Sequence, residues 1–293
     1  VASTRSVTHR KASSSLHLSQ PVDSSAKATE ETGSVPVARR NNAGEESATQ
    51  KDEGALWQAL RNTFQLRALY RHPEVRHYTS YFQSHPGFVN RSLYASIPYM
   101  AYVYHACLRH GVPTEFALLP MLESGYNPFA HSAVGASGLW QMMPQTASLH
   151  HLSNSWWFDE RLAVVSSTEA ALSYLAQLHQ RFHKHSQSWL LAAAAYNAGP
   201  SAIDRALAIQ RRAGGSDFWS LDLPSETRRY VPKLLALAAI VDEQATSSRF
   251  DFPPLSGQSF FTEVRISDQL AIPAISRFSH VSGNLIHYLN PRT

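Results

Sequence analysis

The chain has 293 residues, of which 43% are hydrophobic, so it can bury one large core or two ordinary ones. Its formal net charge is +4, and the basic residues are scattered singly, which argues against a nucleic-acid partner. The single cysteine, Cys107, excludes an internal disulfide and a multi-cysteine metal site, and its apolar neighbours predict a buried thiol. No apolar run approaches the ~18 residues that a membrane span needs, so membrane contact would require an anchor outside this sequence.

The first 53 residues differ sharply in composition from the rest. They contain no Phe, Trp, Tyr, Ile or Met and balance seven basic residues against seven acidic ones. Such a segment cannot bury enough apolar surface to offset the entropy lost on ordering. We expect residues 1–53 to be a disordered tether.

Helical periodicity dominates from Trp57 to about residue 250, which predicts a mainly α fold. A helix should stop at Gly111, and the next should begin at Thr114 as N-cap and bend at Pro120. Further on, Ser166 and Glu169 form the pattern of a capping box. The remaining helices are expected within 166–185, 188–199, 201–214 and 225–244.

The C-terminal part begins after the proline-containing stretch "FPPLSG". Alternation in "SFFTEVRIS" predicts a strand near residue 261, followed by two short helices that end at "LNP". This order resembles the first part of a LysM-type peptidoglycan-binding module, without the closing strand. Residues 258–293 are therefore interpreted as a partial LysM-like segment, for which a packing or spacer role competes with glycan binding.

One acidic residue stands alone in the stretch "LLPMLESGYNPFAHSAVGASGLWQMMP", residues 118–144. Glu123 follows an apolar run, and burial among apolar side chains raises a Glu pKa, as a general acid requires. Most glycosidases pair two carboxylates. Glu115 would lie about 12 Å away along a helix, too far to serve as partner. Three more acids could approach only through tertiary folding, namely Asp159, Glu160 and Glu226.

A single acid suffices if the substrate supplies the second group. The carbonyl oxygen of a 2-acetamido sugar can attack its own anomeric carbon, as in the substrate-assisted exceptions to the two-carboxylate rule. The residues that follow Glu123 suit such a sugar. Small side chains allow close approach, amide and hydroxyl groups can bind the acetamido group, and aromatic rings can pack on the sugar ring.

Three motifs in order, "ESGYNPFAHSAVGASGLWQMMPQTA", "AAYNAG" and "LPSETRRYVPKLLAL", resemble those of the lytic transglycosylases with a goose-type-lysozyme-like fold. The resemblance extends from about Trp57 to Val241 and implies a catalytic domain, with an N-terminal helical extension, over residues 54–250. It also implies non-hydrolytic cleavage of the β-1,4 bond between N-acetylmuramic acid (MurNAc) and N-acetylglucosamine (GlcNAc), which leaves a 1,6-anhydromuramyl end.

The resemblance also assigns roles to individual residues. Glu123 would be the one catalytic residue, acting first as acid and then as base. The substrate-binding residues would be Ser132, Gln141, Met142, Tyr196 and Asn197. Peptidoglycan glycan strands would be the substrate, with other cell-wall enzymes as further candidate partners, and the protein would reside in the bacterial cell envelope.

Simpler interpretations remain for several of these residues. The "AYNAG" motif is also a plain helix C-terminus, and Trp156 and Trp157 are as compatible with core packing as with sugar stacking. The histidine pairs at 150–151 and 183–185 do not converge, so neither a metal nor another cofactor is expected. Two rival functions remain: a goose-type lysozyme, with a second carboxylate that positions water, and a non-catalytic glycan-binding scaffold.

Overall fold

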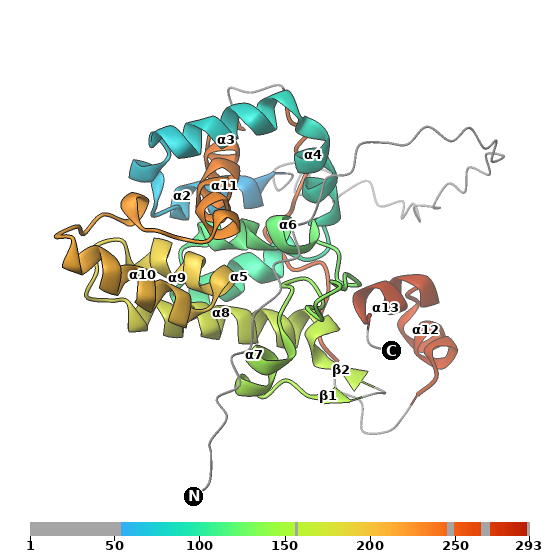
Figure 1. Ribbon diagram of the computed structural model, residues 1–293. Helices are drawn as coiled ribbons and strands as arrows, with labels where there is room; N and C mark the ends of the chain where they lie inside the picture. Colours follow the sequence, from blue (N-terminus) through green and yellow to red (C-terminus); the bar gives the residue numbers. More distant parts are fainter. Residues whose placement is uncertain (1–53, 156–157, 245–248, 265–269, 292–293) are drawn as a thin grey trace, which may run out of the picture. The chain divides into compact units, whose positions relative to one another are not determined.

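Helices make up most of the structure, a computed structural model that describes residues 54–155, 158–244, 249–264 and 270–291 (Figure 1). The backbone divides into Val1–Lys51 and Asp52–Thr293, and all described residues belong to the second unit. The tether prediction for residues 1–53 lies outside the described residues. None of the described helices combines the length and apolar character needed to span a bilayer.

The elements before the lone glutamate are α2 (Ala55–Thr63), η1 (Arg67–Leu69), α3 (Pro73–Ser84), α4 (Pro86–Ala95), α5 (Met100–His110), η2 (Thr114–Leu118) and α6 (Leu119–Ser124). Those after it are α7 (Pro144–Leu149), β1 (Asn154–Ser155), β2 (Phe158–Asp159), η3 (Glu160–Leu162), α8 (Val164–Arg181), α9 (Ser188–Ala198), α10 (Pro200–Arg212), η4 (Phe218–Ser220), α11 (Ser225–Asp242), α12 (Ile272–Ser279) and α13 (Gly283–Leu289). The strands β1 and β2 form a two-stranded antiparallel sheet in which Asn154 pairs with Asp159 and Ser155 with Phe158. The mainly α prediction is confirmed.

Two helices form the centre of this unit, and one of them, α9, has a mostly apolar sequence. The alanine-rich α9 is buried from Leu190 to Ala195, and its small side chains allow α8, α10 and α11 to pack closely around it. The second half of α11 is buried from Leu234 to Val241, and this helix also packs against α3 (Figure 1). Each fully buried Leu contributes ~1.5–3 kcal/mol to folding. These two helices therefore give the frame to which the shorter elements attach.

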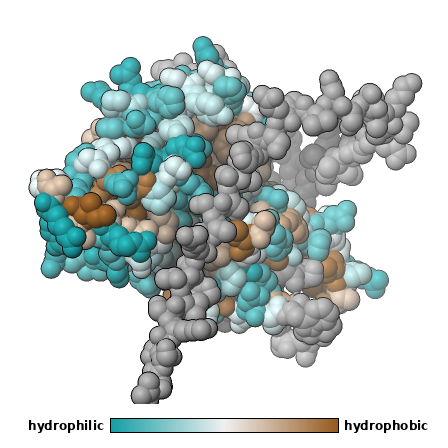
Figure 2. Space-filling view, viewed as in Figure 1, coloured by the Kyte–Doolittle hydropathy of each residue, from teal (hydrophilic) through white to brown (hydrophobic). Residues whose placement is uncertain are grey.

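Hydrophilic residues cover most of the described surface on the face drawn in Figure 2. Cys107 is 0% exposed, so the prediction of a buried thiol is confirmed. The helix stop at Gly111 is also confirmed, because this glycine ends α5 in the left-handed conformation with φ 63°.

Three local predictions are wrong. Thr114 does not cap a helix; it is the first residue of η2, and its hydroxyl lies 2.9 Å from that of Thr63. Pro120 does not bend a continuous helix, because a 3₁₀ segment ends before it and Pro120 lies in the first turn of α6, where a missing N–H costs nothing. Ser166 is inside α8, which begins at Val164. Glu169, the expected capping partner, instead bonds across to α5.

The contacts of Glu169 explain this last outcome. Its carboxylate accepts hydrogen bonds from Tyr102 Oη at 2.7 Å, Arg109 Nη2 at 2.6 Å and His110 Nε2 at 2.6 Å. All three are charge-assisted because the acceptor is a carboxylate, whereas a capping box would give this carboxylate a single backbone N–H. The packing of α5 on α8 thus decides the role of this residue.

The chain after α11 returns to the helical unit. Trp57 Nε1 donates to the Pro253 carbonyl at 2.8 Å, and the Tyr99 hydroxyl donates to the Tyr288 carbonyl at 3.1 Å. The strand expected near residue 261 is not formed in its described part, 259–264, because Phe261 packs against Tyr99 and Tyr102 instead of joining a sheet. The two short helices expected after it are present as α12 and α13.

Candidate functional site

Glu123 is the penultimate residue of the short helix α6. Leu119, Pro120 and Met121 before it are buried, and the helix ends because Gly125 adopts a left-handed conformation with φ 64°. Tyr126 also has a positive φ of 64°, and its buried hydroxyl donates to the Ala117 carbonyl at 2.7 Å. The backbone on both sides of Glu123 is therefore fixed by packing and hydrogen bonds.

The carboxyl group of Glu123 is held by Tyr230, a residue of α11 that lies 107 positions further along the chain. Glu123 is partly buried, and the Tyr230 hydroxyl donates a hydrogen bond to Oε1. Burial raises the pKa of Glu123 to about 7, the hydrogen bond from Tyr230 opposes this rise, and the negative charge of Glu226 adds to it. Near neutral pH both protonation states are populated, as a group that first gives and then takes a proton requires.

Tyr196 and Asn197 lie at the end of α9, and Tyr196 is close to this carboxyl group. The Tyr196 hydroxyl donates to the Trp140 carbonyl at 2.8 Å, and burial together with the charge of Glu123 raises its pKa well above the ordinary range. Tyr196 therefore remains a neutral phenol. Asn197 Oδ1 accepts a hydrogen bond of 2.7 Å from Thr227 Oγ1, which ties α9 to the start of α11. The structure thus brings Glu123, Tyr196 and Tyr230 together.

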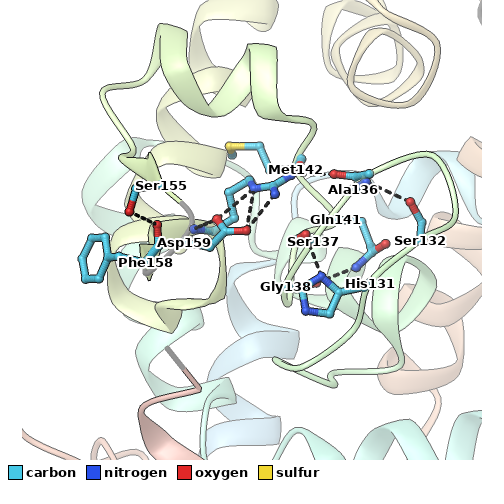
Figure 3. Close-up of polar contacts among 12 residues, drawn as sticks. His131, Ser132, Ala136, Ser137, Gly138, Gln141, Met142, Ser155, Phe158 and Asp159 are labelled. Atoms are coloured by element: carbon cyan, nitrogen blue, oxygen red, sulfur yellow. Dashed lines mark hydrogen bonds and ion pairs between the residues drawn. The ribbon is translucent and has the colours of Figure 1, made fainter. Parts of the chain in front are cut away.

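The loop between α6 and α7 contains the other expected binding residues, and Figure 3 shows how their side chains bond within it. Ser132 Oγ accepts from the Ala136 N–H at 2.9 Å. Gln141 has φ 46°, and its Nε2 donates to the carbonyls of Gly138 at 2.9 Å and Ala130 at 3.1 Å.

Met142 occupies a different environment in the same loop. It is 2% exposed, and its side chain belongs to the hydrophobic core. Its backbone exchanges two hydrogen bonds with Ser137. Among the described residues, none of Ser132, Gln141 and Met142 forms a hydrogen bond with Glu123.

Arg161, a residue of η3, holds this loop in place through hydrogen bonds, a role that was not predicted from the sequence. It is 6% exposed, its Nη1 donates to the carbonyls of Gly135 at 2.6 Å and Met142 at 3.1 Å, and its Nη2 pairs with Asp159 at 2.7 Å. Its own carbonyl presses on Gly138, where a Cβ would come within 2.0 Å of the carbonyl oxygen. The loop therefore keeps its shape through one buried guanidinium and one obligatory glycine.

Of the other acids considered from sequence, the structure brings one within electrostatic reach of Glu123. Asp159 is bound to Arg161, and Glu160 Oε2 accepts from the Ser153 N–H at 2.7 Å. Glu115 is buried, and its Oε1 accepts from the Leu66 N–H at 2.5 Å. Glu226 is exposed, and its negative charge raises the pKa of Glu123. Trp156 and Trp157 lie outside the described residues.

A cavity of about 480 Å³ lies at the far end of α11, beside Ala239 and Asp242, and not at Glu123. Arg67, which lines it, already pairs with Asp242 at 2.9 Å. Within the described ranges, no group of three or more His, Cys, Asp or Glu residues is placed to hold a metal ion. The concentration of ionisable groups with raised pKa values around Glu123 thus makes that carboxyl the candidate site.

Sequence reasoning missed Tyr230 as well as Arg161. Tyr230 lies in the "ETRRYV" motif, four residues after Glu226, so the pair occupies one face of α11. That spacing, together with the motif, was the signal available. The contact with Glu123 could not be read from sequence, because it depends on how α11 packs against α6.

Comparison with known proteins finds a matching family model and several similar sequences. Residues 102–218 match the model of the Transglycosylase SLT domain, a range that contains Glu123, the loop and Tyr196 but ends before Tyr230. Membrane-bound lytic murein transglycosylase D of Escherichia coli K12 is 41% identical over 145 residues, which cover 49% of this chain and 31% of that protein. A putative tributyltin chloride resistance protein of Alteromonas sp. is 39% identical over 110 residues, which cover 38% of this chain and 52% of that protein.

Among solved structures, lytic transglycosylase Slt from Pseudomonas aeruginosa aligns with a TM-score of 0.38 and 22% identity, over 55% of this chain and 27% of that one. The chain spans about a third to a half of the length of the two curated relatives above. Over residues 102–218 this chain is therefore similar to the Transglycosylase SLT domain, and over 145 residues it is similar to a lytic murein transglycosylase.

Proposed function

We propose that this chain cleaves the β-1,4 bond between MurNAc and GlcNAc in peptidoglycan without water and leaves a 1,6-anhydromuramyl end. The observation that carries the proposal is the Glu123 carboxyl, which is fixed by Tyr230 and has a pKa raised to about 7. The SLT domain and the similarity to a lytic murein transglycosylase support the choice of substrate.

In the first step, protonated Glu123 gives its proton to the glycosidic oxygen while the bond from that oxygen to the muramyl C1 breaks. The acetamido carbonyl oxygen of the same sugar forms a bond to C1 and stabilises the positive charge. In the second step, the Glu123 carboxylate takes the proton of the C6 hydroxyl, and O6 bonds to C1 as the acetamido oxygen leaves. One carboxyl group therefore serves both steps, and no atom of water enters the product.

The remaining residues would bind and orient the sugar. Ser132 Oγ accepts one bond from the loop and can still donate its proton to the substrate. The described residues donate no hydrogen bond to Gln141 Oε1, which leaves an acceptor for an acetamido N–H. Asn197 can donate through its amide nitrogen, and the neutral Tyr196 phenol would lie against the charged intermediate. Met142 would support the loop from the core.

Glu226 favours a second candidate, hydrolysis of the same bond. An exposed carboxylate whose charge reaches Glu123 could hold a water molecule, as a goose-type lysozyme would require. Against this, the muramyl C6 hydroxyl is tethered to the reacting ring and has a large effective concentration. We therefore propose that intramolecular capture is faster.

The product distinguishes the two reactions. Purified peptidoglycan is digested to completion, treated with borohydride, and weighed by mass spectrometry. Anhydromuramyl products are one water lighter than lysozyme products and take up no hydrogen on reduction. Products that gain the two hydrogens of a reducing sugar would instead support hydrolysis, and Glu226→Gln should then abolish their formation.

Replacing Tyr230 with phenylalanine tests how Glu123 is positioned. Because the Tyr230 hydrogen bond lowers the pKa of Glu123, its loss should raise that pKa and move the alkaline limb of the kcat/KM profile to higher pH. The carboxyl is also less well held, so kcat should fall about tenfold or more.

Tyr174→Phe is the matched control for this substitution, because Tyr174 packs near Tyr196 with ring centroids 5.8 Å apart and its hydroxyl forms no hydrogen bond with the described residues. The control should keep both the wild-type rate and the wild-type profile. If the alkaline limb of the kcat/KM profile of Tyr230→Phe stays at the wild-type pH, Tyr230 does not act through the Glu123 carboxyl.

Similar proteins are named as membrane-bound or soluble lytic murein transglycosylases. We therefore propose that this chain works on glycan strands in the bacterial cell envelope. Other cell-wall enzymes are candidate partners. For the C-terminal LysM-like segment we propose a packing role. Tyr288 of α13 stacks on Tyr99 and lies near Phe129 of the loop, with ring centroids 6.0 Å apart in each pair.

A further inference from the structure

One face of the first half of α11 presents charged residues beside the candidate acid. Glu226, Arg229, Tyr230 and Lys233 are spaced three, four and seven residues apart, so they share a helix face. The Tyr230 hydroxyl bonds to Glu123, which places this face next to the reacting bond. The two basic residues on it, Arg229 and Lys233, form what we call the cationic pair.

The cationic pair is not neutralised by protein carboxylates. Within the described ranges, neither side chain forms an ion pair or a side-chain hydrogen bond. Lys233 is partly buried, and its Nζ lies 5.6 Å from the centre of the Tyr78 ring on α3. Arg229 is exposed, and its charge is felt by both Tyr78 and Lys233.

The charges around the pair do not cancel it. Burial and the charge of Arg229 both lower the pKa of Lys233, whereas Glu226 raises it. A second acid, Glu74, is felt by Tyr78 from the other side, and both acids are exposed. Lys233 is partly buried beside a second cation, and an anionic ligand would offset the cost of this placement.

Arg228 provides an internal contrast. It is next in sequence to Arg229 but is turned to another face of α11, where its Nη2 pairs with Asp222 at 3.5 Å and donates to the Leu223 carbonyl at 3.1 Å. Its charge is therefore satisfied locally. On the same helix, Arg228 therefore has protein partners for its side chain, whereas Arg229 has none among the described residues.

Building on the proposed function, we infer that Arg229 and Lys233 bind a carboxylate carried by the muramyl residue at the cleaved bond. Each muramyl unit bears a lactyl ether that ends either in a stem peptide with free carboxylates or, where the peptide has been removed, in a carboxylate of its own. Both sources present a carboxylate on the O3 substituent of the ring whose C1–O bond is cleaved. A charge-assisted contact there would favour acidic strands and would fix the orientation of the sugar over Glu123.

The experiment uses the whole chain and three short glycan substrates of equal length. The first carries stem peptides with free carboxylates, the second carries the same peptides with those carboxylates amidated, and the third has lost its peptides and ends in the lactyl carboxylate. The test variant is Arg229→Gln with Lys233→Met, which keeps the aliphatic stem over Tyr78. The control is Arg228→Gln, and melting curves confirm that each variant folds.

For the wild type and the control, amidation should raise KM about tenfold, the equivalent of ~1.4 kcal/mol. For the double variant, KM should be high on both peptide substrates and kcat should change little. The KM of the wild type on the third substrate identifies the source of the carboxylate. A KM as low as on the first substrate assigns recognition to the lactyl carboxylate, and a higher KM assigns it to the stem peptide.

The inference would be overturned if the double variant and the wild type showed the same pattern of KM values across the three substrates, or if the KM of the wild type were the same on all three. Failure of the proposed function is a separate outcome, because the wild type would then cleave none of the three substrates.

Discussion

Replacing Glu123 with glutamine is expected to reduce peptidoglycan cleavage by about 10³-fold or more, while the fold remains intact. Glutamine keeps the shape of the side chain and can still accept the Tyr230 hydrogen bond, but it can neither give nor take the proton. General acid–base catalysis contributes typically ~10²–10⁴ in rate, and here one group serves two steps. Release of soluble fragments from purified peptidoglycan measures the effect.

The same substitution should change stability with pH in a defined direction. The folded-state pKa of Glu123, about 7, lies above its ordinary value of 4.5, so the charged form destabilises the fold. The cost is absent at low pH, where the carboxyl is protonated in both folded and unfolded states, and it grows as pH rises toward and past 7. Glu123→Gln should therefore be more stable than the wild type at pH 8.5, by up to about 2–3 kcal/mol.

The control for both readouts is Asp204→Asn, which removes an exposed carboxylate that pairs with Arg181 on the surface. It should leave activity unchanged and alter stability by less than about 1 kcal/mol. Near-normal activity of Glu123→Gln would remove Glu123 from the mechanism. A variant less stable than the wild type at pH 8.5 would contradict the burial argument.

The second large effect is expected at Gly138, where even one added methyl group should destabilise the protein strongly. Gly138 has φ 77°, and an added Cβ would meet the Arg161 carbonyl oxygen at 2.0 Å and its carbon at 2.9 Å. Both atoms belong to backbone that the Arg161 side chain holds in place. Backbone strain costs ~1–3 kcal/mol, and the overlap adds to it, so Gly138→Ala should lose more than about 3 kcal/mol.

Gly135→Ala is the matched control in the same loop. Gly135 also has a positive φ, 91°, but a Cβ there meets no atom within 4 Å. Strain alone should cost about 1 kcal/mol. Chemical denaturation measures both losses; equal losses at the two positions would show that the contact with Arg161 does not limit the loop.

Local sequence patterns predicted the helical elements well, because their signals act within one or two turns. Gly111 ends α5 as expected, and the alanine-rich stretch at 188–198 forms the buried α9. The errors arose where tertiary partners competed with local ones. Glu169 fits a capping box in sequence, yet it bonds to three residues of α5 in the fold.

The candidate site was predictable only to the extent that it follows from motifs. Glu123 and Tyr196 lie in motifs that could be recognised, and the structure brings them together. The Tyr230 hydrogen bond spans 107 residues, and the Arg161 contact with Gly135 spans 26. No periodicity encodes such contacts, because they depend on how separate helices pack.

The most direct test of the central proposal is the fate of water during the reaction. Peptidoglycan is digested to completion in water enriched in oxygen-18, and each new muramyl end is weighed by mass spectrometry. Intramolecular capture by the C6 hydroxyl predicts ends that are one water lighter than hydrolysis products and that carry no heavy oxygen. Reducing muramyl ends that contain oxygen-18 would show that water attacks C1, and the non-hydrolytic mechanism proposed for Glu123 would be wrong.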